Sequence, residues 1–229
     1  MRRRTAACMK RRFIAACSAL AIAVVLPGLA SADSSLSSPS AMAAKAPPQY
    51  DAVFDTTAGR FVIAVTRSWA PRGADRFYNL VKHGFFNGAA FFRVVPGFVV
   101  QFGLSPTPAV NKAWTTAVIS DDSVKESNRT GFASFASAGP NTRTTQVFIN
   151  LADNARLDRM GFAPFGKVVS GMNAVMKIYA GYGEEPNQDA ITSGGKSYLA
   201  KNFPRLDTVS SAKIVVPLAS PHPKTTHAP

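Results

Sequence analysis

The feature that most constrains this chain is a single arginine inside an apolar stretch. Residues 91–103 have the sequence Phe-Phe-Arg-Val-Val-Pro-Gly-Phe-Val-Val-Gln-Phe-Gly, with Arg93 between Phe92 and Val94. A charged group is costly to bury unless it is paired or used. A second segment, residues 138–150, also combines apolar and amide side chains. We therefore expect an apolar groove into which one cation and a few amides point, suited to a neutral substrate that needs a hydrogen-bond donor and no nucleophile.

Residues 1–32 have the composition of a secretory signal peptide. Six arginines and lysines precede or begin an apolar run over residues 13–26, and small residues at 30–32 offer a cleavage site before Asp33. The alternative is an uncleaved membrane anchor, but the run is short for a membrane-spanning helix of about 20 residues. We expect cleavage and export to the periplasm, with secreted or membrane-tethered forms as alternatives and no stable membrane insertion after cleavage.

Removal of this segment changes both the charge and the cysteine content. It holds six of the 26 lysines and arginines and none of the 13 acidic residues, so the rest of the chain carries 20 basic against 13 acidic residues, a net charge of +7 instead of +13. These charges are spread along the chain, which disfavours a nucleic-acid partner. Because both cysteines, Cys8 and Cys17, lie in the segment, the remaining chain has no disulfide, cysteine nucleophile or cysteine metal site.

One folded domain, residues 49–217, is expected between two polar ends. Residues 33–48 are rich in Ser, Ala and Pro and are predicted to be a flexible linker, and residues 218–229 a disordered tail. Helical spacing predicts one helix that opens at Pro71 and another over 172–179, with a short helical turn over 196–202. Strands are predicted at 50–56, 60–66, 91–101, 131–137, 146–151, 162–169 and 208–217. Many strands without βαβ alternation indicate a mainly β, antiparallel barrel or sandwich.

Several enzyme classes are excluded by missing residues. His83 is the one histidine between residues 49 and 217, so no Ser-His-Asp set can be built with confidence. No phosphate loop, zinc motif or EF-hand loop is present, and we expect no metal and no cofactor. The Asp121-Asp122 pair lies in a polar stretch, where a capping or solvated role is favoured over acid–base chemistry. Residues 128–130 match a glycosylation sequon, which is a weak signal.

The remaining candidates surround Arg93. A guanidinium cannot act as a base, but it donates several hydrogen bonds and keeps its charge. Apolar side chains can line a pocket and amides can orient a peptide backbone; the candidates are Phe98, Phe148, Leu157 and Phe162 for the first role and Gln101 and Gln146 for the second. The alternative for each phenylalanine is core packing, and for Arg93 it is a buried ion pair.

Four segments resemble the cyclophilin family, in the order that the family shows. They are residues 91–101, Ala-Gly-Pro-Asn-Thr at 138–142, Gln-Val-Phe-Ile-Asn at 146–150, and Phe-Gly-Lys-Val-Val-Ser-Gly-Met at 165–172. The resemblance spans about residues 50–182 and, with a final strand near 208–216, about three quarters of the chain. It implies a closed eight-stranded antiparallel β-barrel capped by two α-helices, and a peptidyl-prolyl cis-trans isomerase that needs no cofactor.

The implied reaction fits a site without a nucleophile. Rotation about an X-Pro bond faces a barrier of about 18–20 kcal/mol and takes tens to hundreds of seconds uncatalysed. Twisting localises a lone pair on the proline nitrogen, so a donor aimed there binds the transition state better than the ground state. The resemblance implies that Arg93 is this donor. It also implies that Phe98, Val99, Phe148 and Leu157 hold the proline ring, that Gln101 binds the carbonyl side, and that Ala136 and Ser137 offer backbone contacts.

The implied partners are proline-containing segments of unfolded or partly folded proteins, and the implied role is assistance in the folding of exported proteins by a monomer. A non-catalytic proline-peptide-binding chaperone or scaffold on the same barrel is the alternative. Arg156 stands where many cyclophilins have a pocket tryptophan associated with cyclosporin binding, so cyclosporin sensitivity is not implied. Phe162 stands near the usual pocket histidine, and Ser137 replaces a usual asparagine. Residues 104–130 diverge and are predicted to form a loop beside the groove.

Overall fold

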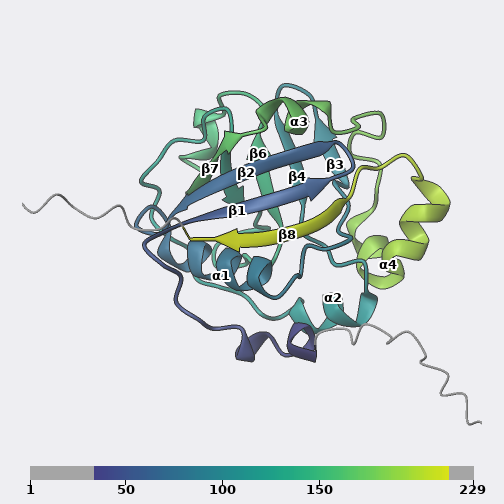
Figure 1. The fold of residues 1–229 in the computed structure, drawn as a ribbon, viewed down its shortest axis with the longest axis horizontal. Helices are drawn as coiled ribbons and strands as arrows, with labels where there is room; N and C mark the ends of the chain where they lie inside the picture. Colours follow the sequence, from purple (N-terminus) through teal and green to yellow (C-terminus); the bar gives the residue numbers. More distant parts are fainter. Residues whose placement is uncertain (1–33, 217–229) are drawn as a thin grey trace, which may run out of the picture. The chain divides into compact units, whose positions relative to one another are not determined.

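The computed structural model describes residues 34–216. The predicted signal peptide and the predicted disordered tail lie outside these described residues. Eight strands form one antiparallel sheet in the order β3-β4-β6-β5-β7-β2-β1-β8 (Figure 1). Their bounds are β1 Gln49–Thr56, β2 Gly59–Thr66, β3 Arg93–Val95, β4 Val99–Phe102, β5 Phe132–Phe135, β6 Val147–Asn150, β7 Pro164–Ser170 and β8 Val209–Val215. The mainly β class and the predicted strand positions are therefore confirmed.

The sheet curls into a half-barrel, which corrects the expectation of a closed barrel. Its end strands, β3 and β8, form no ladder with each other among the described residues. The segment just before β3 contacts the start of β8 through a bridge between Ala90 and Thr208 and through hydrogen bonds between residues 88–91 and 207–209. The outer edge of β3 is taken instead by another segment, because the Val94 amide donates to the Gly183 carbonyl at 3.0 Å. An edge strand that is short and covered in this way has little backbone left for closure.

Within residues 34–216, four α-helices accompany the sheet, two more than expected. They are α1 Pro71–Lys82, α2 Pro108–Trp114, α3 Met172–Lys177 and α4 Gln188–Asn202. The first opens at Pro71 and the third covers most of 172–179, as predicted. Helix α2 lies within the stretch predicted as a loop, and α4 is longer than the predicted turn. It kinks at Gly195, which has a φ of +53°, and only Ile191 and Gly195 are buried along it, so it lacks the apolar periodicity that a sequence pattern needs.

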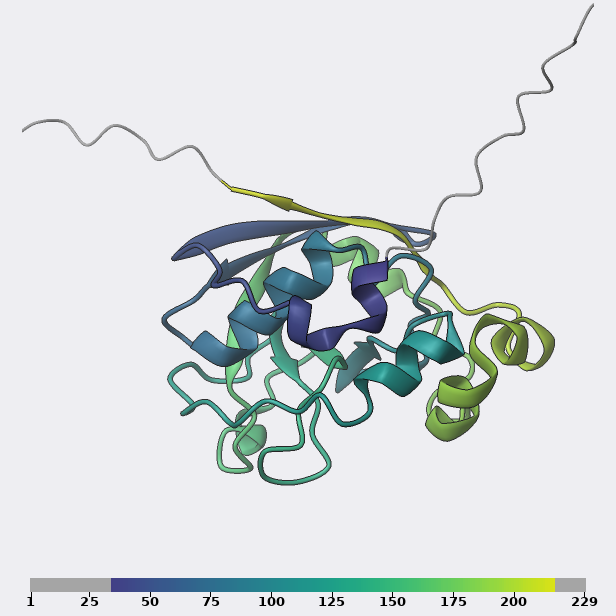
Figure 2. The ribbon, with the colours of Figure 1, turned by 90° about the horizontal axis from the view of Figure 1, so that it is seen from below.

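The core lies between α1 and the sheet. Figure 2 shows α1 beneath the strands, and it contacts both β7 and β8. Phe77 of α1 packs against Phe165 of β7, with ring centroids 4.7 Å apart, and against Phe54 of β1 at 6.1 Å. Phe54 in turn stacks on Phe61 at 5.0 Å. Burial of such large apolar side chains supplies most of the folding free energy, and it leaves the opposite side of β3 and β4 available for a site.

Residues 34–48 pack against the domain, which corrects the prediction of a flexible linker. They contain two 3₁₀ helices, η1 Ser34–Ser37 and η2 Pro39–Ala41. The indole nitrogen of Trp114 donates to the Leu36 carbonyl at 2.8 Å. The side chain of Asn79 on α1 accepts from the Ala44 amide at 3.1 Å and donates to the Ala44 carbonyl at 2.7 Å. Composition alone gave no sign of these tertiary hydrogen bonds, which replace water as the partner of the backbone.

In the described part of the chain, each helix is too short or too polar to cross a membrane.

Asn79→Ala should release the N-terminal segment. Asn79 is 1% exposed, and its loss removes both hydrogen bonds to the Ala44 backbone, so we expect the free energy of unfolding to fall by about 1–3 kcal/mol. Hydrogen exchange at the Ala44 amide should accelerate in the same variant. Urea unfolding and exchange mass spectrometry measure both effects. Asn202→Ala, at an exposed helix end, is the control and should change stability by less than about 0.5 kcal/mol; unchanged exchange in Asn79→Ala would contradict the packing of this segment.

Candidate active site

One groove of about 500 Å³ brings all ten predicted site residues together. Its walls come from β3, β4 and β6, from the segment after β5, and from the 3₁₀ helix η3 Ala155–Leu157 with the loop that follows it. The predicted residues that line it are Arg93, Phe98, Val99, Gln101, Ala136, Ser137, Gln146, Phe148, Leu157 and Phe162. Sequence reasoning missed Ala138, Thr142, Thr144 and Gln188, which also line it. The first three lie in or beside the quoted motifs, whereas Gln188 belongs to the unpredicted part of α4.

The polar side of the groove is set by strand register. A turn at Pro96-Gly97, with Gly97 at a φ of +71° and the Phe98 amide donating to the Val95 carbonyl at 2.9 Å, joins β3 to β4. Proline followed by a glycine with positive φ is typical of a type II turn. This turn pairs Arg93 with Gln101 across the two strands, and β6 pairs Gln101 with Phe148. Directly paired residues project from the same face of a sheet, so the three side chains stand in one row.

A chain of hydrogen bonds runs along this row. The Nη1 of Arg93 donates to Oε1 of Gln101 at 3.2 Å, and Nε2 of Gln101 donates to Oε1 of Gln146 at 2.7 Å. Gln101 is 6% exposed, and its amide is fixed at both ends by these contacts. The groove therefore presents a guanidinium and two oriented amides beside its apolar wall.

Arg93 does form an ion pair, as the alternative for this residue predicted, but the pair is not buried. Its Nε donates to Oε1 of Glu184 at 2.6 Å, and the ion pair brings Nη2 to 2.5 Å from the same oxygen, but the Arg93 side chain is 25% exposed and that of Glu184 is 61% exposed. The pair thus lies at the rim of the groove and not in the core. The guanidinium also lies over the ring of Phe98, with its carbon 5.5 Å from the ring centroid. Arg93 is held from several sides and still faces the groove.

The apolar wall is a cluster separate from the main core, which decides against the core-packing alternative. Val99, Phe148 and Leu157 form its buried part, and Phe98, Ala136 and Phe162 pack partly buried against them. Phe148 and Phe162 meet edge to face, with centroids 5.6 Å apart. Rings in this arrangement attract each other beyond their area of burial, and both line the groove.

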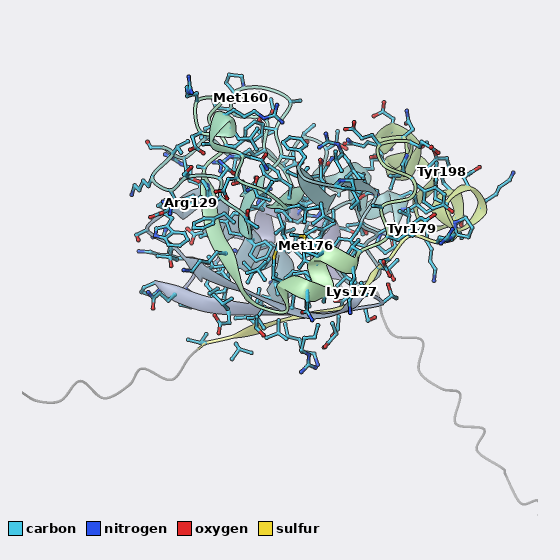
Figure 3. The ribbon with its side chains drawn as sticks, turned by 90° about the horizontal axis from the view of Figure 1, so that it is seen from above. Arg129, Met160, Met176, Lys177, Tyr179 and Tyr198 are labelled. Carbon is cyan, nitrogen blue, oxygen red and sulfur yellow. The ribbon has the colours of Figure 1, made fainter. Side chains whose placement is uncertain are left out.

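Arg156 adds a second cation over the same pocket residue. Its guanidinium carbon lies 4.6 Å from the ring centroid of Phe98. A cation over an aromatic face contributes about 0.5–1 kcal/mol at an exposed site. The position that the family resemblance assigns to a tryptophan is therefore used here to hold Phe98 in place. Met160, labelled in Figure 3, lies nearby in sequence and is 66% exposed.

A buried amide network lies behind the wall, and sequence reasoning did not anticipate it. Asn154 donates to the Phe98 carbonyl at 2.9 Å and to Oδ1 of Asn150 at 2.8 Å. Asn150 donates to Oδ1 of Asn128 at 3.2 Å. Asn128 donates in turn to the Phe162 carbonyl at 2.8 Å. The backbones of two pocket residues are thus tied to one network of buried amides, whose order depends on every member being satisfied.

The network ends on Asp158. One carboxylate oxygen accepts from the amide and the side chain of Asn128, at 2.9 and 2.8 Å, and the other accepts from the Ser127 hydroxyl at 2.5 Å. Burial raises the pKa of Asp158, but the hydrogen bonds from Ser127 and Asn128 outweigh it, so the pKa lies below its ordinary value. Because Asn128 is fully buried, the sequon at 128–130 is closed to glycosylation in the folded protein.

Two other candidates of the sequence have structural roles. The carboxylate of Asp122 accepts from the amides of Arg72 and Gly73, at 3.0 and 2.9 Å, in the first turn of α1. This confirms the expected capping role, and it stabilises the start of the helix. His83 is the C-cap residue of α1 and does not line the groove.

Comparison with known proteins agrees with this site. The sequence model of a family described as cyclophilin type peptidyl-prolyl cis-trans isomerase/CLD matches residues 52–195. Peptidyl-prolyl cis-trans isomerase A of Dickeya dadantii is 39% identical over 128 residues, which cover 54% of this chain and 67% of that protein. A peptidyl-prolyl cis-trans isomerase of Schizosaccharomyces pombe is 34% identical over 129 residues, which cover 54% of this chain and 81% of the relative.

The fold is also similar to a solved structure. A Cryptosporidium parvum cyclophilin type peptidyl-prolyl cis-trans isomerase, crystallised in the presence of the dipeptide Ala-Pro, aligns with a TM-score of 0.55 and 18% sequence identity. The alignment covers 72% of this chain and 99% of that one. The sequence relatives thus include bacterial and fungal proteins, and the protozoan protein shares the fold.

Asp158→Asn should lower the free energy of unfolding and make that free energy less dependent on pH in acid. At neutral pH the amide brings an N–H group against the donors of Asn128, and we expect the free energy of unfolding to fall by about 1–3 kcal/mol. A carboxylate with a depressed folded-state pKa stabilises the fold above its unfolded pKa and loses that contribution as the pH falls through the folded pKa. The wild-type protein should therefore lose stability more steeply than the variant below about pH 4.

Urea unfolding at a series of pH values measures this difference, with Asp189→Asn, an exposed carboxylate of α4, as the control. Parallel stability curves for the wild type and Asp158→Asn would contradict the role assigned to the carboxylate.

Proposed function

Because this chain belongs to the cyclophilin family of peptidyl-prolyl cis-trans isomerases, we propose that its groove binds an extended peptide across Arg93 and catalyses rotation about the X-Pro bond. The observation that supports this most strongly is the meeting of a fixed guanidinium and an isolated apolar pocket in one groove. A peptide with a proline offers a match for both features, a hydrophobic ring and a neighbouring polar amide.

The catalytic task of Arg93 follows from the chemistry of the amide. Resonance keeps the X-Pro bond planar, and rotation removes that resonance and leaves a basic lone pair on the proline nitrogen. A hydrogen bond from the guanidinium to that nitrogen forms only as the bond twists. It therefore lowers the barrier without stabilising the planar ground state equally. No proton is transferred and no covalent intermediate forms, which agrees with a groove lined by no histidine or cysteine in the described residues.

The other lining residues hold the peptide. The proline ring occupies the pocket of Phe98, Val99, Phe148, Leu157 and Phe162, where its burial contributes hydrophobic free energy. Gln101 donates to the carbonyl side of the peptide, and Gln146 keeps the Gln101 amide in orientation. The amide of Ala136 already donates to the Gln146 carbonyl at 3.0 Å. Ala136 therefore offers its carbonyl, and Ser137 its backbone, to the extended peptide.

The proposed setting is the folding of exported proteins, most simply in the periplasm. It rests on the order of a basic segment, an apolar run and small residues in residues 1–32. Proteins that cross a membrane unfolded must isomerise their prolines afterwards, and uncatalysed isomerisation is slow enough to limit folding.

Arg93→Ala should abolish most of the isomerase activity while the fold is kept. Removal of one donor to a developing charge costs on the order of 10²–10³-fold in rate, so we expect a loss of that size in kcat/KM. The measurement is the cis-to-trans conversion of a proline tetrapeptide, with thermal unfolding as a check on structure. Arg60→Ala removes the same charge from an exposed pair with Asp55 and should leave the rate unchanged. Full activity of Arg93→Ala would contradict the mechanism, and peptide binding without any catalysis by the wild type would favour a chaperone or scaffold.

Export can be tested on the natural protein. If residues 1–32 are a cleaved signal peptide, N-terminal sequencing of the protein recovered from cells should begin at Asp33, and fractionation should place it outside the cytoplasm. A mature protein that begins before Asp33 and remains with the membrane fraction would contradict cleavage and indicate a tethered form.

A further inference from the structure

We propose that Glu184 is a positioning residue of this enzyme, which fixes the guanidinium of Arg93 in the orientation that isomerisation needs. This inference rests on the proposed role of Arg93 as the donor to the proline nitrogen. It concerns a residue outside the motifs that indicated the site, on the segment between α3 and α4.

The segment that carries Glu184 is anchored to the strand that carries Arg93. The Val94 amide of β3 donates to the Gly183 carbonyl at 3.0 Å, so the residue next to Glu184 is bonded to the residue next to Arg93. The ring of Tyr182 packs edge to face against Tyr179 at 5.2 Å. It also packs against Phe203, beyond α4, at 5.1 Å. Tyr179 lies on the α4 side of the molecule in Figure 3. The backbone position of Glu184 is thus fixed independently of its own side chain.

The contact itself leaves part of the guanidinium available. Oε1 of Glu184 accepts from Nε at 2.6 Å and lies 2.5 Å from Nη2 in the ion pair. Nη1 donates to Gln101, which lines the groove. A guanidinium has N–H groups beyond these, one more on each terminal nitrogen. Glu184 therefore holds the edge of the guanidinium that includes Nε, while Nη1, on the side of Gln101, remains next to the groove with a free donor.

Holding one edge fixes the other because the guanidinium is planar and rigid. A free arginine side chain has several rotatable bonds and spends little time in any single orientation. A donor that is already aimed at the position of the twisted amide avoids the entropy cost of ordering the side chain when the transition state forms. The ring of Phe98, with its centroid 5.5 Å from the guanidinium carbon, limits the same motion, so Glu184 shares the task and does not perform it alone.

The expected size of the effect follows from exposure. The Glu184 side chain is 61% exposed, and ion pairs near water are screened and individually weak. We therefore expect loss of Glu184 to lower kcat by about two- to fivefold, with little change in KM. A carboxylate that instead competed with the peptide for Arg93 would have the opposite effect, because its removal would raise kcat/KM.

The test is a double-mutant cycle between Glu184→Ala and Arg93→Ala, measured as kcat and KM for a proline tetrapeptide. Glu185→Ala is the matched control, because it removes the same charge from the neighbouring exposed residue. Glu184→Gln, which keeps an acceptor oxygen, should retain part of the activity. The unfolding midpoint of each variant is measured alongside, so that a loss of structure is distinguished from a loss of positioning.

The proposal predicts that Glu184→Ala lowers kcat in the Arg93 background and has no further effect in Arg93→Ala, since there is then no guanidinium to position. Glu185→Ala should leave kcat unchanged. The proposal is overturned if Glu184→Ala leaves or raises kcat, or if it lowers kcat equally in both backgrounds. If Arg93→Ala itself is fully active, the proposed mechanism fails first; if only Arg93→Ala loses activity, the mechanism stands and Glu184 has no positioning role.

Discussion

The row of cross-strand partners Arg93, Gln101 and Phe148 is the constraint on which the rest of the site depends. It exists because β4 pairs with β3 on one side and β6 on the other, in a register fixed by the turn at 96–97. A slip of one residue would turn these side chains to the opposite face of the sheet. The register thus places a permanent charge beside an apolar pocket, and the partners of Arg93 offset the cost of its partial burial.

Two sets of contacts, or supports, hold the residues of this row in place. On the polar side, Gln101 and Glu184 bind separate edges of the Arg93 guanidinium. On the apolar side, buried amides that end on Asp158 bind the backbones of Phe98 and Phe162. In the first support Glu184 is exposed to solvent, so its ion pair contributes little to stability, whereas the second support is buried and costly to break. We expect substitutions among the contacts of Arg93 to change the rate of the reaction. Substitutions in the buried amide network should change both the stability of the fold and the shape of the pocket.

Most of the sheet and ten of the fourteen residues that line the groove could be predicted from the sequence, because alternation and quoted motifs are local patterns. The hairpin of β1 and β2 and the helix at Pro71 are of this kind. Helix α4 could not be predicted because it buries few side chains, and α2 because its seven residues are too few to show a helical period. The open seam of the sheet, the packing of residues 34–48 and the contact of Glu184 with Arg93 all depend on tertiary hydrogen bonds between distant segments, which leave no periodic signal.

The central claim is that one register brings a hydrogen-bond donor and a proline pocket to the same peptide bond. A crystal structure of the protein with a bound proline peptide tests it most directly. The account predicts the proline ring between Phe98, Phe148 and Leu157, with the Arg93 guanidinium facing the prolyl nitrogen, near enough to reach a hydrogen-bond distance of about 2.7–3.2 Å when the bond twists. A peptide bound away from this pocket, or one whose X-Pro bond lies out of reach of Arg93, would contradict it.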